Sequence, residues 1–161
     1  YTEMAKDMGV DPETKKTIPW VNSDKKFIRS MFKNILGPME KDGVDFWWLD
    51  WQQGMFDPKM KNLSNTWWIN YAFFSDMEKR RETRPMLYHR WGGLGNHRYQ
   101  VGFSGDAVIS WKSLDFQPYF NSTASNVLYG YWSHDLGGHF EADRIDPEIP
   151  KCIPVGYNSE H

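Results

Sequence analysis

The strongest constraint on the fold is an alternation between short β-prone runs and longer helix-prone segments. The β-prone runs, rich in aromatic and β-branched residues, occupy residues 44–49, 86–90, 98–103 and 128–134. The helix-prone segments occupy residues 23–41, 66–81 and 110–127. Strands that alternate with helices favour an α/β fold with a parallel sheet, so we expect this fold class.

The helix-prone segments carry recognisable boundary signals. The first has the i, i+3, i+4, i+7 apolar stripe of one helix face, and Asp24 or Ser23 is a suitable N-cap. We expect Gly37-Pro38 to break or bend this helix, and Pro118 to interrupt the third segment, because proline cannot donate a backbone hydrogen bond. The first β-prone run is expected to be a buried strand that ends at Asp50.

Composition limits the functional classes. The chain has 161 residues, enough for one domain with a core, and its net charge of −2 gives no general electrostatic case for nucleic-acid binding. No apolar run approaches the roughly 18 residues of a membrane-spanning helix. The one cysteine, Cys152, excludes an internal disulfide and a multi-cysteine zinc site.

Aromatic residues are unusually frequent, and several lie beside acidic residues. The chain has 9 tryptophans, of which Trp47, Trp48 and Trp51 flank Asp50. A pyranose ring has apolar faces and polar edges, so a sugar site needs both aromatic rings and carboxylates. Each tryptophan taken alone is better explained by core packing, but the set beside acids indicates a carbohydrate site.

A charged residue stands at the end of each β-prone run: Asp50, Arg90, Asp106 and Asp135. The carboxyl ends of parallel strands meet at one edge, where ligands bind both in a (β/α)8 barrel and in an open doubly wound sheet. The pattern alone does not separate these two architectures. The structural alternative is a buried ion pair between Arg90 and Asp135 that braces two strands.

Four ordered blocks carry a resemblance to a known family. They are residues 46–50 (FWWLD), 84–90 (RPMLYHR), 98–106 (RYQVGFSGD) and 131–138 (YWSHDLGG). Over roughly residues 1–147 the chain resembles glycoside hydrolase family 31, the retaining α-glucosidase family. The resemblance implies a (β/α)8 TIM barrel and hydrolysis of α-glycosidic bonds by a double displacement.

The resemblance assigns Asp50 to the nucleophile and Asp106 to the general acid/base. Retaining hydrolysis needs two carboxyl groups about 5–5.5 Å apart, on opposite sides of the bond that breaks. Asp50 must be ionised and Asp106 protonated when the reaction starts. The uncharged neighbours Phe103 and Gly105 are compatible with a protonated Asp106.

The resemblance also implies substrate-binding positions. Arg90 and Asp135 match residues that hold hydroxyls of the sugar at the cleavage point. Trp48 and Phe103 match aromatic positions that line the pocket, and His134 is expected to support the neighbouring Asp135. The histidines do not have the spacing of a helical metal pair, and we expect no metal ion and no cofactor.

The blocks depart from the family pattern at positions that shape the pocket. Gln52 and Gln53 replace a common carboxylate after the nucleophile, and Phe103 stands where tryptophan is usual. An exo-acting α-glucosidase is the best single expectation. An α-xylosidase, an α-galactosidase, an α-N-acetylgalactosaminidase and a carbohydrate-binding or inactive homologue are the alternatives.

The length indicates a partial barrel. About four of the eight strands are expected, from the fourth strand onward, so residues 1–161 are interpreted as a fragment of the catalytic barrel. Residues 148–161 form an atypical tail with two prolines. A half-barrel has unpaired sheet edges, which the rest of the barrel or self-association would cover. Whether this chain alone is active is left open.

Two short motifs bear on the compartment. Asn62-Leu63-Ser64 and Asn121-Ser122-Thr123 fit the N-glycosylation acceptor pattern. They favour a secreted, periplasmic or lysosomal-type location, and the expected partner is an oligosaccharide or another α-glycoside rather than nucleic acid or a membrane.

Overall fold

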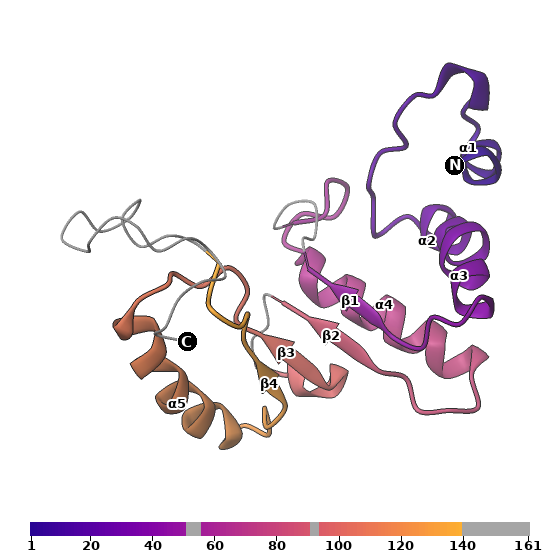
Figure 1. Cartoon of the computed structure of the whole chain (residues 1–161). Coiled ribbons are helices and arrows are strands. Elements are labelled where there is room, and N and C mark those ends of the chain that lie inside the picture. Colours follow the sequence, from indigo (N-terminus) through magenta and orange to yellow (C-terminus); the bar gives the residue numbers. More distant parts are fainter. Residues whose placement is uncertain (51–55, 91–93, 140–161) are drawn as a thin grey trace. The chain divides into compact units, whose positions relative to one another are not determined.

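The chain forms two compact units in a computed structural model that describes residues 1–50, 56–90 and 94–139 (Figure 1). The first unit is Tyr1–Leu87 and the second is Tyr88–His161. Each is described here by itself. No helix within the described ranges is long and apolar enough to cross a membrane.

The first unit is mainly helical. Its elements in chain order are α1 (Thr2–Met8), η1 (Pro12–Thr14), α2 (Lys25–Met31), η2 (Phe32–Leu36), α3 (Gly37–Lys41), β1 (Trp47–Leu49) and α4 (Asn65–Arg80). The N-cap of α4 is Ser64, whose hydroxyl accepts from the Trp67 N–H, and its last turn carries Lys79 and Arg80. The expected helix over residues 66–81 is therefore confirmed to within a residue at each end.

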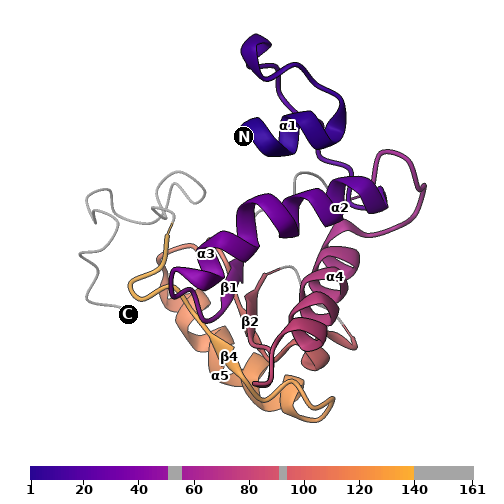
Figure 2. The same cartoon turned by 90° about the vertical axis from the view of Figure 1, so that its right-hand side faces the viewer.

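The segment from α2 to α3 stays helical throughout, as Figure 2 shows, so the expected break at Gly37-Pro38 is wrong. Asp24 caps α2 by accepting from the N–H groups of Lys26 and Phe27. The wider π-helical turn η2 precedes the proline, and the Gly37 N–H donates to the Phe32 carbonyl five residues earlier. This change of bonding register accommodates a proline that cannot donate.

Aromatic packing holds β1 in the first unit. The rings of Phe32 and Phe73 meet edge to face with centroids 5.2 Å apart, and Trp47 approaches Phe73 at 6.4 Å. The expectation of a fully buried strand is wrong, because Leu49 is buried whereas the Trp48 side chain is 57% exposed. Successive side chains of a strand point to opposite faces, and here only one face is covered.

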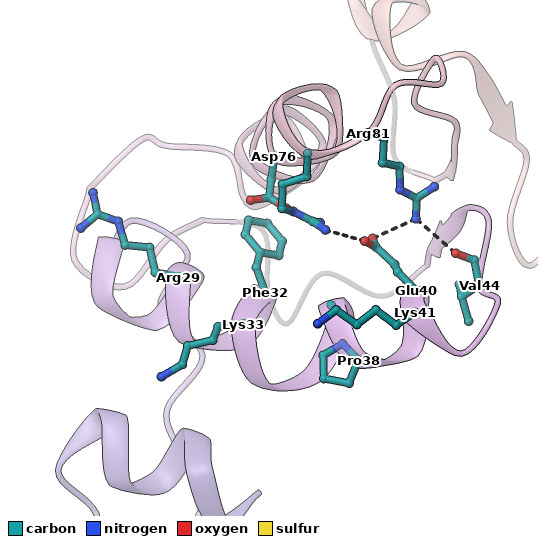
Figure 3. A pocket seen from close by; sticks show the side chains of 11 residues that line it. Arg29, Phe32, Lys33, Pro38, Glu40, Lys41, Val44, Asp76 and Arg81 are labelled. Carbon is teal, nitrogen blue, oxygen red and sulfur yellow. Dashed lines mark hydrogen bonds and ion pairs between the residues drawn. The ribbon is translucent and has the colours of Figure 1, made fainter.

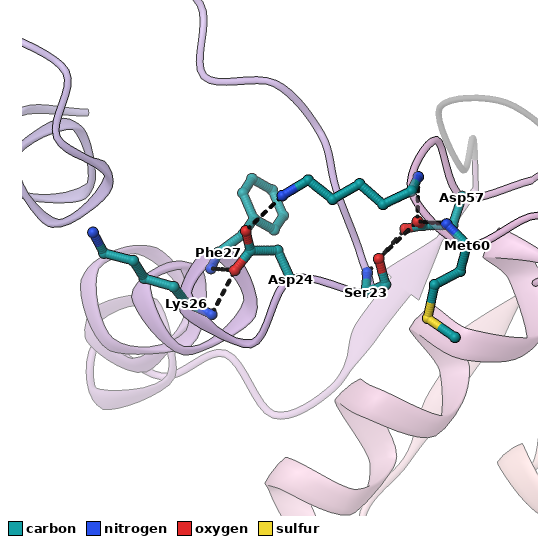
Figure 4. Close-up of polar contacts among 7 residues, drawn as sticks. Ser23, Asp24, Lys26, Phe27, Asp57 and Met60 are labelled. Atoms are coloured by element: carbon teal, nitrogen blue, oxygen red, sulfur yellow. Dashed lines mark hydrogen bonds and ion pairs between the residues drawn. The ribbon is translucent and has the colours of Figure 1, made fainter.

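A buried carboxylate anchors the chain between β1 and α4 (Figure 4). Asp57 is 4% exposed and accepts hydrogen bonds from the backbone N–H groups of Ser23, Lys59 and Met60. The Ser23 hydroxyl also donates to the Asp57 Oδ1, at 2.7 Å. Burial raises the pKa of Asp57, but these donors outweigh burial and hold the pKa below its usual value.

The second unit contains the parallel strands. Its elements are β2 (Leu87–His89, which begins at the unit boundary), η3 (Asn96–Tyr99), β3 (Val101–Phe103), α5 (Trp111–Ser125) and β4 (Trp132–Ser133). Strand β3 pairs in parallel with β2 on one side and with β4 on the other. The predicted α/β class with parallel strands is confirmed.

Two expected strands are shorter than the sequence indicated. The run 98–103 is extended only from Val101, because η3 includes Tyr99 and Gln100 has a left-handed φ of 66°. The run 128–134 is reduced to Trp132–Ser133, and Leu128 also has a φ of 66°. A residue with a positive φ lies outside the extended backbone region, and a propensity pattern does not reveal where this occurs.

Helix α5 continues through Pro118, so the expected interruption is wrong. Its N-cap is Ser110, whose hydroxyl accepts from the Ser113 N–H. Pro118 is exposed, where water can bond the carbonyl that lacks a helical donor. The inner side of α5 meets β4 where the Phe120 and Trp132 rings lie 4.6 Å apart.

The core of the second unit contains a buried histidine. His89 is 0% exposed, and its ring lies near those of Tyr99 and Tyr129, with centroids 6.3 and 6.2 Å away. Burial lowers the pKa of His89 to about 4. The imidazole is therefore neutral at physiological pH.

Replacement of Asp57 with alanine should destabilise the chain. Four donors lose one acceptor, so we expect the free energy of unfolding to fall by about 1–3 kcal/mol in urea titrations at pH 7. The lowered pKa of Asp57 stabilises the fold above its unfolded value near 3.8, and this contribution is lost as the pH falls through the folded value. Asp45→Ala, at an exposed side chain, is the control. Equal effects of the two variants would contradict the anchoring role.

His89 should make the fold sensitive to mild acid. Between pH 6.5 and about 4 the unfolded chain binds a proton that the folded chain excludes, so stability falls as the pH falls. The difference between the folded and unfolded pKa values of His89 corresponds to at most about 3 kcal/mol of unfolding free energy. In His89→Phe the loss between pH 6.5 and 4 should be smaller by that amount. An unchanged slope in His89→Phe would refute this assignment.

Candidate active site

Most of the predicted site residues lie at the carboxyl ends of the strands in the second unit. They are Arg90, Phe103, Asp106, His134 and Asp135. Arg90 directly follows β2, Phe103 is the last residue of β3, and His134 directly follows β4. Because the three strands are parallel, their carboxyl ends share one edge, as the sequence pattern predicts.

An ion pair joins the ends of β2 and β3. The Arg90 Nη1 lies 3.1 Å from the Asp106 Oδ1, and the two side chains are 7% and 14% exposed. The sequence predicted uncharged neighbours for Asp106, and the structure adds this cation. The expected partner of Arg90 in the structural alternative was Asp135, whereas the ion pair is made with Asp106.

The guanidinium of Arg90 packs against an aromatic ring and against glycine backbone. On one side the Phe103 ring centroid is 5.9 Å from the Arg90 Cζ, and this ring in turn packs on Tyr88 at 4.8 Å. On another side lies Gly105, where a Cβ would overlap the guanidinium. An aromatic face and bare backbone thus hold the cation beside Asp106.

Backbone bonds place Asp135 beside Asp106. The Ala107 N–H donates to the Gly105 carbonyl at 2.8 Å, which makes a three-residue turn centred on Asp106. The His139 N–H then donates to the Ala107 carbonyl at 2.8 Å, which ties the two loops together. Asp106, Asp135 and His139 each present a ligand atom, and these atoms lie within 4.8 Å of one another.

His139 is a site residue that the sequence reasoning did not propose for substrate or catalysis. Its Nε2 lies 4.0 Å from the Asp106 Oδ2, the oxygen that does not face Arg90 in the ion pair. The sequence feature that could have indicated His139 is its position four residues after Asp135, directly after Gly137-Gly138. The side chains of Asp106, Asp135 and His139 are of the types that ligate metal cations. The positive charge of Arg90 beside Asp106 opposes a metal ion there. The absence of a metal stays a prediction.

His134 supports the segment that precedes Asp135. Its Nδ1 lies 3.0 Å from the Ser104 hydroxyl oxygen, and the Ser104 N–H donates to the Ser133 carbonyl at 3.1 Å. These contacts join the ends of β3 and β4 just before the two acids. The supporting role that was expected for His134 stays a prediction.

A sequence model of the glycosyl hydrolase family 31 TIM-barrel domain matches residues 4–151. The chain belongs to glycosyl hydrolase family 31. No curated protein matches the chain closely enough to count as a relative. The resemblance drawn from the four blocks is therefore confirmed at the level of the family.

Family 31 membership makes this α/β chain part of a TIM barrel and places it among glycoside hydrolases, whose substrates are carbohydrates. The described residues contain four strands, whereas a complete barrel has eight. The expected partial barrel is confirmed. The residue roles and the sugar specificity stay predictions.

The remaining predicted site residues of this family 31 chain belong to the first unit. Asp50 directly follows β1 and is half-buried, and Trp48 is largely exposed. The pairing of Asp50 with Asp106 stays a prediction. Several residues singled out in the sequence lie outside the described ranges: Trp51, Gln52, Gln53 and the tail over residues 148–161.

A groove of about 740 Å³ in the first unit is not part of this constellation (Figure 3). Glu40 at its edge accepts from Arg80 and from the Trp47 indole, and pairs with Arg81 at 3.1 Å. Burial raises the pKa of Glu40, but these cations and donors prevail and lower it overall. The ion pairs join α3 to the end of α4, so the charged residues of this groove have a structural role in the first unit.

Removal of the Arg90 guanidinium should be costly, because it leaves the Asp106 carboxylate nearly buried without its partner. Arg90→Ala is expected to lower the free energy of unfolding by about 3 kcal/mol. Arg98→Ala, at an exposed side chain of η3, should change it by less than about 0.5 kcal/mol. Chemical denaturation of both variants at pH 7 measures the difference. Similar values for the two would show that the pair is not formed in solution.

Proposed function

We propose that this chain is catalytic-barrel sequence of a retaining, exo-acting α-glycosidase, with α-glucosides as the first substrate class. The observation that carries the proposal is the grouping of Arg90, Asp106, Asp135 and His139 at strand ends in a family 31 chain. Two carboxylates, a guanidinium and an imidazole together offer both acceptors and donors to sugar hydroxyls.

In the first step Asp50 acts as the nucleophile and Asp106 as the general acid. The Asp50 carboxylate forms a bond to the anomeric carbon while the glycosidic carbon–oxygen bond breaks. Asp106 gives its proton to the departing oxygen, which leaves as the alcohol of the aglycone. In the second step Asp106 takes a proton from water, which attacks the anomeric carbon and releases Asp50.

Arg90 links substrate binding to the Asp106 carboxyl group. Hydroxyls of the bound sugar can take the donors that Arg90 otherwise directs at the Asp106 Oδ1. Asp135, within reach of the same space, accepts from neighbouring hydroxyls. Binding of the sugar would thereby draw the guanidinium away from the Asp106 carboxyl group.

One exposed aromatic residue supports a sugar as the ligand. Phe103 is not that residue, because it is 2% exposed and lies against Arg90, so it acts through the guanidinium. The exposed Trp48 ring offers a flat apolar face one residue away from the strand end that leads to Asp50. The same features suit a carbohydrate-binding protein without turnover, which is the alternative that the experiment below must separate.

Covalent labelling tests the nucleophile. A 5-fluoro-α-D-glucosyl fluoride should trap a glycosyl-enzyme, and peptide mass mapping should locate the adduct on Asp50. Asp50→Asn should abolish labelling, whereas Asp45→Asn, at an exposed acid nearby, should label normally. Asp106→Asn should lower turnover of α-glucosides by about 10²–10⁴-fold, the usual contribution of a general acid.

A substrate panel separates the alternatives. Hydrolysis of 4-nitrophenyl α-glucoside, α-xyloside, α-galactoside and α-N-acetylgalactosaminide by the chain reports the sugar. Glucose binding without hydrolysis of any of the four, together with no covalent adduct, would favour a carbohydrate-binding or inactive fragment or homologue. An adduct on an acid other than Asp50 would overturn the assignment of the nucleophile.

A further inference from the structure

Gly105 differs from two other left-handed glycines, Gly9 and Gly138, in what surrounds it. Its φ is +73°, and a Cβ built on it would overlap the Nε, Cζ and Nη2 atoms of Arg90. Gly9 has almost the same φ, +76°, yet a Cβ there would meet nothing within 4 Å. Gly138, at +73°, would meet the Ile109 side chain at 2.8 Å. Among these three, only residue 105 lies against a charged group of the candidate site.

We propose that Gly105 is a positioning residue for Arg90, because its missing side chain leaves the space in which the guanidinium lies against the backbone. The catalytic consequence rests on the proposed function, whereas the structural one does not. The surfaces that lie against the cation include the Phe103 ring, the backbone at Gly105 and the Asp106 carboxylate.

A methyl group at residue 105 would displace the guanidinium rather than only crowd it. The overlap involves the planar end of Arg90, which lies at the tip of a side chain that can rotate. Arg90 is 6% exposed and lies beside Phe103, so a rotated guanidinium loses its contacts there. The ion pair with the Asp106 Oδ1, at 3.1 Å, would open at the same time. Residue 105 thus determines whether the cation lies on the acid.

A stability cycle tests the contact itself. In the full chain, Gly105→Ala should raise the unfolding equilibrium constant by about tenfold more than Gly9→Ala, because both add the strain of a left-handed alanine and only the first meets a neighbour. In an Arg90→Ala background the excess should disappear, because the overlapped atoms are gone. An excess that persists without Arg90, or no excess at all, would overturn the proposal.

The cycle remains decisive if Gly105→Ala does not fold. The double variant Gly105→Ala/Arg90→Ala should then recover a cooperative unfolding transition by circular dichroism, close to that of Arg90→Ala alone. If the double variant is also unfolded while Arg90→Ala folds, residue 105 matters for a reason other than Arg90 and the proposal is wrong.

A kinetic cycle tests the catalytic consequence. With 4-nitrophenyl α-glucoside, Gly105→Ala should lower kcat/KM by about tenfold or more, whereas Gly9→Ala should leave it unchanged. In the Arg90→Ala background, Gly105→Ala should change kcat/KM by less than twofold. A glycine with a merely structural role would lower activity equally in both backgrounds. The stability cycle decides the role of Gly105 whether or not this partial barrel hydrolyses an α-glycoside on its own.

Discussion

The ion pair between Arg90 and Asp106 is the interaction around which the candidate site is organised. It joins the ends of two neighbouring parallel strands, and both side chains are nearly buried. A buried pair contributes little net stability, but its geometry is strict, since either charge alone in that place is unfavourable. The surrounding features all serve this geometry: an aromatic face below, bare backbone beside it and a short turn that presents the acid.

The order of the elements and the place of the polar residues could be predicted from the sequence, because both follow from local pattern. Apolar periodicity indicated the helices, and a charged residue after each β-prone run indicated the shared edge. The family followed from four blocks in order, and the match over residues 4–151 confirms it. The same reasoning located Arg90, Asp106, Asp135 and His134, although it paired Arg90 with a different acid in its structural alternative.

The differences between the structure and the predictions from the sequence have definite physical causes. Gly37-Pro38 and Pro118 do not stop their helices, because a π turn in one case and an exposed position in the other accommodate the missing donor. Gln100 and Leu128 shorten two strands through left-handed backbone angles that non-glycine residues seldom adopt. His139 was not proposed for the site because its approach to Asp106 depends on a contact between loops, which sequence spacing does not encode.

The bond from the His139 N–H to the Ala107 carbonyl has a consequence for how such a pocket can diversify. It connects the loop of the proposed acid to the loop of the carboxylate proposed to bind hydroxyls, through main-chain atoms that every residue except proline can supply. Side chains of either loop can therefore vary while this link between the loops is kept. Under the proposed function, the chemistry and the selectivity of the site would then be traits on which mutation can act separately.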